Sequence, residues 1–173
     1  MLINFWCGRQ VLDGFYNVDA VRNPRAPRDP ELLHAVQFAA DGAVLNPLPL
    51  PDGCADELQA MHAIEHVYEW EAPQLLAEWK RLLQPGGLLV LELPNIEHAA
   101  RNLLAGMSPQ MCMFPLYGDG SHRDPYMCHR FGYAPKTIAA LLKAGGFIDI
   151  RHLEPRTHGG RANRDMRVEA RKQ

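Results

Sequence analysis

Two histidines and a glutamate near the middle of the chain have a spacing that can bind a metal ion. Residues 62–66 read HAIEH, and on a helix this H-x-x-E-H pattern puts His62 and His66 on the same face. Two imidazoles in that arrangement can share a zinc ion, with the glutamate as the base for peptide hydrolysis. The chemistry of these residues therefore depends on the element that carries them.

The surrounding sequence argues against a zinc hydrolase. Residues 56–61 are a candidate strand, so the motif follows a strand directly instead of lying within a long helix, and Tyr68 crowds its far side. No later helical segment supplies the third carboxylate that such a site needs. We therefore expect no metal site and interpret Glu65 and His66 as structural residues.

Composition and charge narrow the class of protein further. The chain has 173 residues, 47% of them hydrophobic, and a net charge of −2, so we expect one domain with its own core and no nucleic-acid partner. No apolar run approaches the roughly 20 residues that span a bilayer, and the opening MLINFWCGRQ does not resemble a signal peptide. The four cysteines form no C-x-x-C pair. These features predict a cytoplasmic protein without a membrane partner, and they leave the oligomeric state open.

Strand and helix patterns alternate along the chain. Short apolar runs over residues 2–7 and 15–18 predict buried strands, and the run LLVLEL at residues 88–93 predicts a strand covered on both faces. Residues 73–83 form an amphipathic pattern, and Pro30 is expected to open a helix that reaches about Ala40. Further elements are expected as helices at residues 96–104 and 134–145 and strands at residues 147–153 and 166–170. The alternation predicts an α/β fold with a largely parallel sheet in three layers.

Residues 107–133 form a long irregular segment that is dense in Met, Tyr, His and Asp. A connection of that length inside a compact domain often has a function, so we expect a lid or substrate-binding segment. Histidine can deprotonate a hydroxyl or amine near neutral pH, which makes His122, Tyr126 and His129 the candidate catalytic residues. The alternative is that the histidines form hydrogen bonds within the lid.

Several candidate ligand-binding residues follow the predicted strands. Gly8 follows the first strand, where a glycine lets the backbone approach a ligand closely. Asp19 ends the second strand, where a carboxylate can accept hydrogen bonds from a ribose diol. His62 follows a middle strand, and ligands of open α/β sheets bind at this carboxyl edge. Each residue alone is typical of an ordinary turn or cap, so only the combination points to a binding site.

Longer stretches carry a resemblance to a known family. The segments INFWCG, GFYNVD, LPLPDGCADELQAMHAIEHV and LLAEWKRLLQPGGLLVLELPN occur in this order, and together they resemble the class I S-adenosylmethionine-dependent methyltransferases. The resemblance covers nearly the whole chain, residues 1–173. It implies a single Rossmann-like domain, S-adenosyl-L-methionine as the cofactor, and methyl transfer to a hydroxyl or amine of a small-molecule substrate.

The same resemblance implies a set of cofactor contacts. The glycine-rich motif after the first strand surrounds the methionine and ribose parts, an acid holds the ribose hydroxyls, a loop flanks the adenine, and two residues after the fourth strand lie beside the sulfonium. These positions correspond to Asn4, Phe5, Trp6, Cys7, Gly8, Asp19, Asn46, Leu48, His62 and Ala63.

Three departures from the family pattern matter for function. Trp6 stands where the family has its first glycine, and residues 7–14 are too short for a full helix between the first two strands. The acid that contacts the adenine amine is absent from its usual place, and Asn46 is the nearest polar residue. An alternative function is therefore a catalytically degenerate methyltransferase-like domain that serves as a binding or assembly module.

Overall fold

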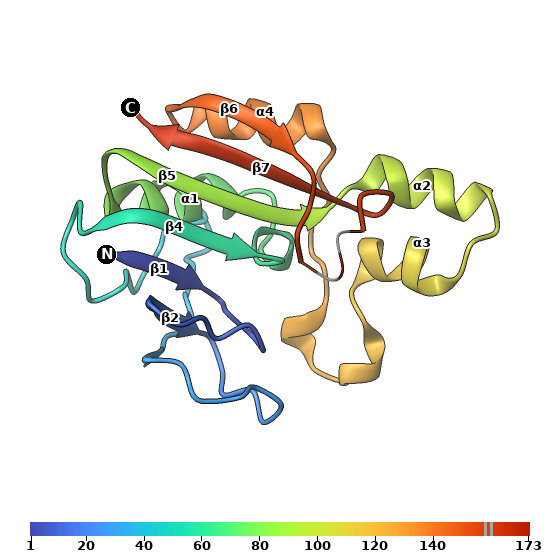
Figure 1. The fold of residues 1–173 in the computed structure, drawn as a ribbon, viewed down its shortest axis with the longest axis horizontal. Helices are drawn as coiled ribbons and strands as arrows, with labels where there is room; N and C mark the ends of the chain where they lie inside the picture. Colours follow the sequence, from blue (N-terminus) through green and yellow to red (C-terminus); the bar gives the residue numbers. More distant parts are fainter. Residues whose placement is uncertain (158, 160) are drawn as a thin grey trace.

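In the part of the chain that the structure describes, residues 1–157, 159 and 161–173 of a computed structural model, seven strands form one sheet. The strand order is β3-β2-β1-β4-β5-β7-β6 (Figure 1). All neighbouring pairs are parallel except that β7 runs antiparallel to both β5 and β6. The strands are β1 (Leu2–Phe5), β2 (Phe15–Asp19), β3 (Leu32–Leu33), β4 (Ala55–Met61), β5 (Leu83–Pro94), β6 (Phe147–Leu153) and β7 (Asp165–Lys172).

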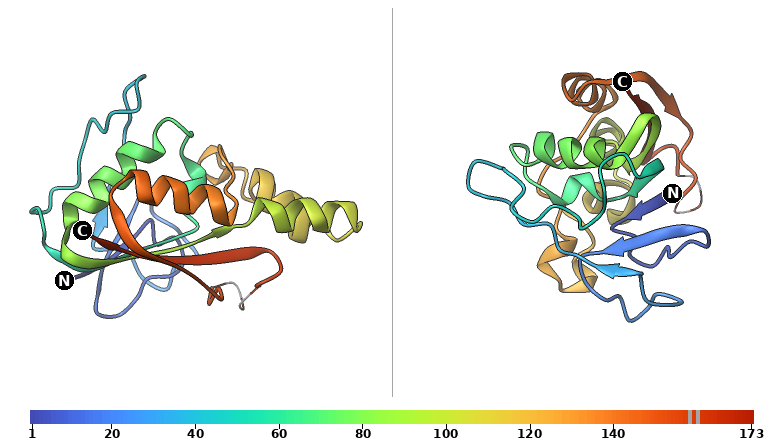
Figure 2. Two further views of the ribbon diagram at one scale, coloured as in Figure 1. Left: turned by 90° about the horizontal axis from the view of Figure 1, so that it is seen from above. Right: turned by 90° about the vertical axis from the view of Figure 1, so that its left-hand side faces the viewer.

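The two long helices that pack on the sheet lie on the same face. Figure 2 shows α1 (Ala72–Leu82) and α4 (Pro135–Ala144) side by side above the strands. Beyond the carboxyl end of β5, α2 (Ile96–Leu104) packs against α3 (Pro109–Tyr117). Short 3-10 turns complete the structure: η1 (Ile64–His66), η2 (Gly120–His122) and η3 (Pro125–Met127). Among the described residues, none of the helices has the length and apolar character that a bilayer span requires.

The hydrophobic core lies between these helices and the sheet. Trp79 of α1 is fully buried and meets the ring of Phe5 edge-on, with 5.4 Å between ring centroids. Leu58 and Leu91 face the same helix layer from β4 and β5. Burial of each such side chain contributes about 1.5–3 kcal/mol. The helix packing therefore explains why alternate strand residues are apolar.

The opposite face of the sheet carries polar side chains. Glu57 and Gln59 alternate along β4 with the core residues, and Glu92 and Arg167 lie beside them on β5 and β7. Together they line a hollow of about 450 Å³. This polar lining gives an amphipathic helix little apolar surface to pack against, and α1 and α4 pack on the other face (Figure 2).

Most of the sequence-based fold is confirmed, but the expected three layers are not: in the described part of the chain α1 and α4 both cover one face of the sheet (Figure 2), because the other face carries polar side chains. The α/β class, the mostly parallel sheet and the shortened N-terminal helix region are all present, and residues 6–14 form a loop without a helix. The helix expected from Pro30 to about Ala40 is wrong. There the chain forms β3 and then an extended segment, with His34 donating to the carbonyl of Asp19.

Two buried asparagines fasten the loop of residues 6–14 to the sheet. The side-chain amide of Asn4 donates to the carbonyl of Gln10 at 2.6 Å and to Oδ1 of Asn17 at 2.8 Å. Asn17 accepts from the amide of Leu12 at 2.8 Å and donates to its carbonyl at 2.9 Å. These side chains satisfy backbone groups that a helix would otherwise satisfy itself.

Replacing Asn17 with alanine is expected to lower the free energy of unfolding by about 2–4 kcal/mol, because Leu12 and Asn4 lose buried hydrogen-bond partners. Chemical denaturation measures this change. Asn163→Ala removes an exposed amide and serves as the control, with an expected change within about 0.5 kcal/mol. Equal stability of both variants would show that the loop is held by other contacts.

Candidate functional site

The carboxyl ends of β1, β2 and β4 meet at one edge of the sheet. The chain leaves β1 toward β2 on one side and β4 toward β5 on the other, so the strand order reverses between β1 and β4. In open α/β sheets a ligand binds in the crevice at such a reversal. Five of the ten predicted cofactor residues, Trp6, Cys7, Gly8, His62 and Ala63, directly follow β1 and β4.

The turn after β1 has the backbone shape of a glycine-rich motif although it begins with tryptophan. Trp6 has φ +50°, in the left-handed region that favours glycine. Gly8 has φ +55°, and a Cβ added there would meet no atom within 4 Å. Phe5 points into the core, and the amide of Cys7 donates to the carbonyl of Val18 at 3.0 Å. Open space therefore lies beside Gly8.

The carboxylate of Asp19 lies next to this turn. It is 7% exposed and accepts a hydrogen bond from the amide of Ala20 at 2.8 Å. Burial raises the pKa of Asp19, and the amides of Ala20 and Gly8 oppose that effect. The structure thus brings together two predicted cofactor residues, a glycine backbone and an acid, from the ends of neighbouring strands.

Other predicted cofactor residues make their contacts within the protein. The side chain of Asn46 accepts from the amide of Gln37 and donates to the carbonyl of Ala35. Leu48 is 2% exposed, and its amide donates to Glu78 of α1. The side chain of Asn4 is used in the loop network described above. For these three residues the structure shows a structural role.

Cys7 does not offer a reactive thiolate. Its side chain is buried, and burial together with the charge of Asp19 raises the pKa of its thiol to about 12. Thiolate is the nucleophilic form of cysteine, so the chemistry of this edge does not come from Cys7.

The HAIEH motif does not lie on a long helix. His62 follows β4 with φ +54°, and its amide donates to the carbonyl of Glu92 at 2.7 Å. The next residues form the single turn η1, with Ala63 fully buried. His62 and His66 therefore do not share a helical face as in a zinc hydrolase, in agreement with the sequence-based argument. Instead, Nδ1 of His62 lies 3.3 Å from Oε1 of Glu65.

Glu65 carries a buried charge at this edge. Its side chain is fully buried, and burial alone raises the pKa of its carboxyl. The imidazole of His62, and then those of His129 and His66, outweigh that effect and lower the pKa to about 2. The carboxylate is therefore ionised at neutral pH.

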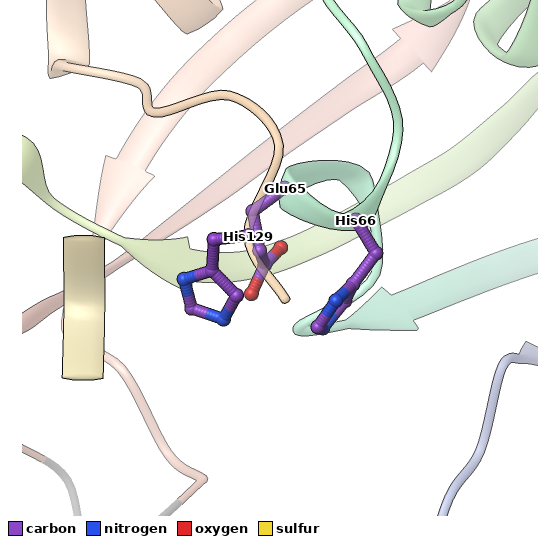
Figure 3. Close-up of side chains that lie close together, drawn as sticks. All are labelled: Glu65, His66 and His129. Atoms are coloured by element: carbon purple, nitrogen blue, oxygen red, sulfur yellow. The ribbon is translucent and has the colours of Figure 1, made fainter. Parts of the chain in front are cut away.

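The long segment of residues 107–133 is only partly irregular. It contains α3 and the turns η2 and η3. His122 ends η2, but its side chain lies outside the described part of the structure, while Tyr126 of η3 is 54% exposed. His129 is half-buried, and its ring centroid lies 4.9 Å from that of His66 (Figure 3). Among the candidate catalytic side chains that the structure describes, only His129 reaches the motif after β4.

The sequence did not reveal the role of Glu92. This residue is fully buried on the polar face and accepts hydrogen bonds from the amides of Arg156 and Thr157, the hydroxyl of Thr157 and the guanidinium of Arg167. Burial raises the pKa of Glu92, but these donors outweigh that effect, so the pKa is lower than usual. A single acid within the apolar run LLVLEL was the available signal. Glu92 ties the connection between β6 and β7 to the end of β5.

The left-handed backbone conformation of Trp6 is expected to be strained, and substitutions at this position can measure the strain. Trp6→Gly is expected to be about 1 kcal/mol more stable than Trp6→Ala, because alanine keeps the left-handed penalty of about 1–2 kcal/mol and glycine does not. The exposed Trp70, which lacks a positive φ, is the matched control, where alanine should equal or exceed glycine. Thermal and chemical unfolding of the four variants measure both differences. The same order at both positions would contradict strain at Trp6.

Glu92 gives a test with a defined pH dependence. Glu92→Gln should lower the free energy of unfolding at pH 7 by about 2–3 kcal/mol, because it removes charge-assisted hydrogen bonds. Since the folded-state pKa is depressed, this contribution is present above the unfolded value of about 4.3 and is lost as pH falls through the lower folded value. Urea titrations from pH 7 to pH 3 should show that the difference in free energy of unfolding between variant and wild type becomes smaller below about pH 4. A gap that widens on acidification would refute this assignment.

Comparison with known proteins agrees with this geometry. Residues 13–91 match the family model described as a methyltransferase domain. No curated protein matches the chain. The match covers β2, β3, β4, α1 and most of β5, which includes Asp19 and the whole HAIEH motif.

Solved structures share the fold at low sequence identity. An S-adenosylmethionine-dependent methyltransferase from Archaeoglobus fulgidus is 15% identical with a TM-score of 0.61, over 99% of this chain and 85% of that chain. A possible histamine N-methyltransferase from Thermotoga maritima is 16% identical with a TM-score of 0.60, over 99% and 82%. The 1,6-didemethyltoxoflavin-N1-methyltransferase of Burkholderia thailandensis, solved with S-adenosylhomocysteine bound, is 17% identical with a TM-score of 0.58, over 99% and 70%.

The domain match, the strand order and the pairing of Gly8 with Asp19 at the reversal point agree with one another. Residues 13–91 thus match a methyltransferase domain, and the chain as a whole has the fold of S-adenosylmethionine-dependent methyltransferases.

Proposed function

We propose that this protein transfers the methyl group of S-adenosyl-L-methionine to a hydroxyl or amine of a small-molecule substrate. The observation that carries the proposal is the meeting of the Gly8 backbone and the Asp19 carboxylate at the edge where the strand order reverses. A small acceptor is supported by the net charge of −2, which offers no attraction to nucleic acid. The toxoflavin-type methyltransferase with the same fold also takes a small molecule.

The residues at this edge fit the cofactor. Open space beside Gly8 leaves room for close approach of a ligand, and Asp19 keeps acceptor capacity for a ribose diol beyond its bond to Ala20. Trp6 also has a buried Nε1 without a partner among the described residues, which is a donor available to a ligand. We assign the ribose to Asp19 and the sulfonium side to His62 and Ala63. When bound, the cofactor supplies an electrophilic methyl group and leaves as S-adenosylhomocysteine.

The acceptor side of the site is assigned to the segment of residues 107–133. Nδ1 of His129 lies 2.9 Å from the carbonyl of Pro115. Because a carbonyl only accepts, this nitrogen carries the proton and the neutral ring presents Nε2 as an acceptor. We infer that His129 faces the acceptor group, and that Tyr126 of the same segment contacts the rest of the substrate. Orientation of the acceptor supplies much of the rate in such a transfer.

The place of action is inferred from the thiols. All four cysteines are free in the structure, which fits the reducing cytoplasm. We therefore place the reaction there, without a nucleic-acid or membrane partner.

A second function is favoured by the same turn that supports the first. Trp6 brings an indole to a position where the family has glycine, and no helix follows it in residues 7–14. A helix N-terminus that would otherwise stabilise the cofactor is therefore missing. The alternative is a methyltransferase-like domain that binds or assembles with a partner without catalysing transfer.

Calorimetric titration with S-adenosylmethionine and S-adenosylhomocysteine separates the two functions. Both ligands should bind one per chain, and Asp19→Ala should weaken binding about 10- to 100-fold, because one or more charge-assisted hydrogen bonds to the ribose are lost. Asp29→Asn changes an exposed acid and is the control with unchanged affinity. If neither ligand binds at millimolar concentration, the proposed methyltransferase activity is wrong and the alternative, a binding or assembly module, is favoured.

A further inference from the structure

Glu65 has an environment that its own protein does not complete. Its side chain is 1% exposed, yet neither carboxylate oxygen receives a hydrogen bond from the described residues. Its ion-pair partner is His62, whose Nδ1 lies 3.3 Å from Oε1. Buried carboxylates are normally paired and hydrogen-bonded or bind a metal ion. An incomplete buried carboxylate therefore indicates a missing partner.

Two histidine rings present acceptor nitrogens toward this carboxylate. Nδ1 of His66 lies 3.2 Å from the carbonyl of Cys128, and Nδ1 of His129 lies 2.9 Å from the carbonyl of Pro115. A carbonyl fixes the proton on Nδ1, so Nε2 of each neutral ring carries a lone pair. Metal-binding histidines show this same second contact to a backbone carbonyl. Both rings are thus held in the tautomer that a metal ion requires.

The fold brings the three side chains together from distant parts of the sequence. The carbonyl of Glu65 accepts hydrogen bonds from the amides of Arg130 at 2.7 Å and Phe131 at 3.3 Å. These bonds hold the chain after His129 against η1. Figure 3 shows the carboxylate of Glu65 between the rings of His66 and His129, and one donor atom from each lies within 4.8 Å of the other two.

We propose that Glu65, His66 and His129 bind one divalent transition-metal ion of the zinc type. Two imidazoles and one carboxylate are the protein ligands of known zinc sites that keep an open position. Bond lengths of about 2.0–2.1 Å require the donor atoms to lie about 3.3 Å apart. Binding therefore draws the rings inward by a small rotation, while their contacts to the carbonyls remain.

The position of the ion gives it a role in the transfer, and this role rests on the proposed function. η1 directly follows His62 and Ala63, the residues assigned to the sulfonium side, and both histidines are half-buried at the surface of the site. The open position of the ion would take an oxygen or nitrogen of the acceptor, so His129 would meet the acceptor through the ion and not through a free Nε2. An acceptor hydroxyl bound to such an ion gives up its proton to solvent more readily, which leaves the oxygen ready for the methyl group.

Zinc titration of the metal-free protein tests the site without any methyl donor. After treatment with EDTA and dialysis, calorimetry should show that one Zn²⁺ binds per chain. The melting temperature should rise as zinc is added. Glu65→Gln and His129→Ala should each weaken binding about 100-fold or more, since loss of even a residue behind a ligand costs 10- to 100-fold. Circular dichroism and the melting temperature in EDTA check that both variants fold. S-adenosylhomocysteine is titrated separately, so failure of the metal site is distinct from failure of cofactor binding.

Matched controls exclude other zinc ligands. Glu69→Gln and His152→Ala change exposed residues outside the cluster, and Cys128→Ser removes the exposed thiol next to His129; all three should bind zinc as the wild type does. Binding of Co²⁺ to the unmodified protein provides a second measurement. Its visible absorption bands should be those of an ion bound by nitrogen and oxygen atoms. Absence of zinc binding at about 100 μM, unchanged binding in Glu65→Gln and His129→Ala, or a sulfur-to-cobalt charge-transfer band would each overturn the proposal.

Discussion

The packing of α1 and α4 against a single face of the sheet is the constraint from which the other features follow. Trp79 and its apolar neighbours occupy the space between helices and strands, so apolar side chains are required on that face alone. The other face is free to carry Glu57, Gln59 and Glu92. Buried polar groups must be satisfied, and here loops supply the partners, through Asn17 beneath residues 6–14 and through Glu92 beneath the β6–β7 connection.

This arrangement concentrates conformational strain at the functional edge. Two of the four described non-glycine residues with positive φ, Trp6 and His62, follow the neighbouring strands β1 and β4. Such strain persists only where surrounding contacts enforce it, and it is common at binding sites. Here the core contact of Phe5 and the bond from His62 to Glu92 enforce it. The edge proposed for the cofactor is thus held by core and strand contacts, while the proposed acceptor side comes from a separate segment.

Much of the fold could be predicted because it depends on local patterns. The amphipathic helix predicted at residues 73–83 is present within one residue, and the run at residues 88–93 lies within β5, which begins five residues earlier, at Leu83. Both were predictable because burial on a sheet or helix imposes a simple period. The helix expected after Pro30 failed because pairing with β2 outweighed a local start signal. The contact of His129 with Glu65 could not be predicted, because it depends on tertiary hydrogen bonds from Arg130. The sequence alone therefore could not place His129 beside HAIEH.

The central claim is that the cofactor binds at the edge formed by the ends of β1, β2 and β4. Hydrogen exchange with and without S-adenosylhomocysteine tests it most directly, because it reports binding amide by amide. The account predicts slower exchange at Gly8, at Ala20 beside Asp19 and at Ala63, with little change in β6. Protection confined to the polar face around Gln59 and Arg167, or no protection at all, would contradict the account.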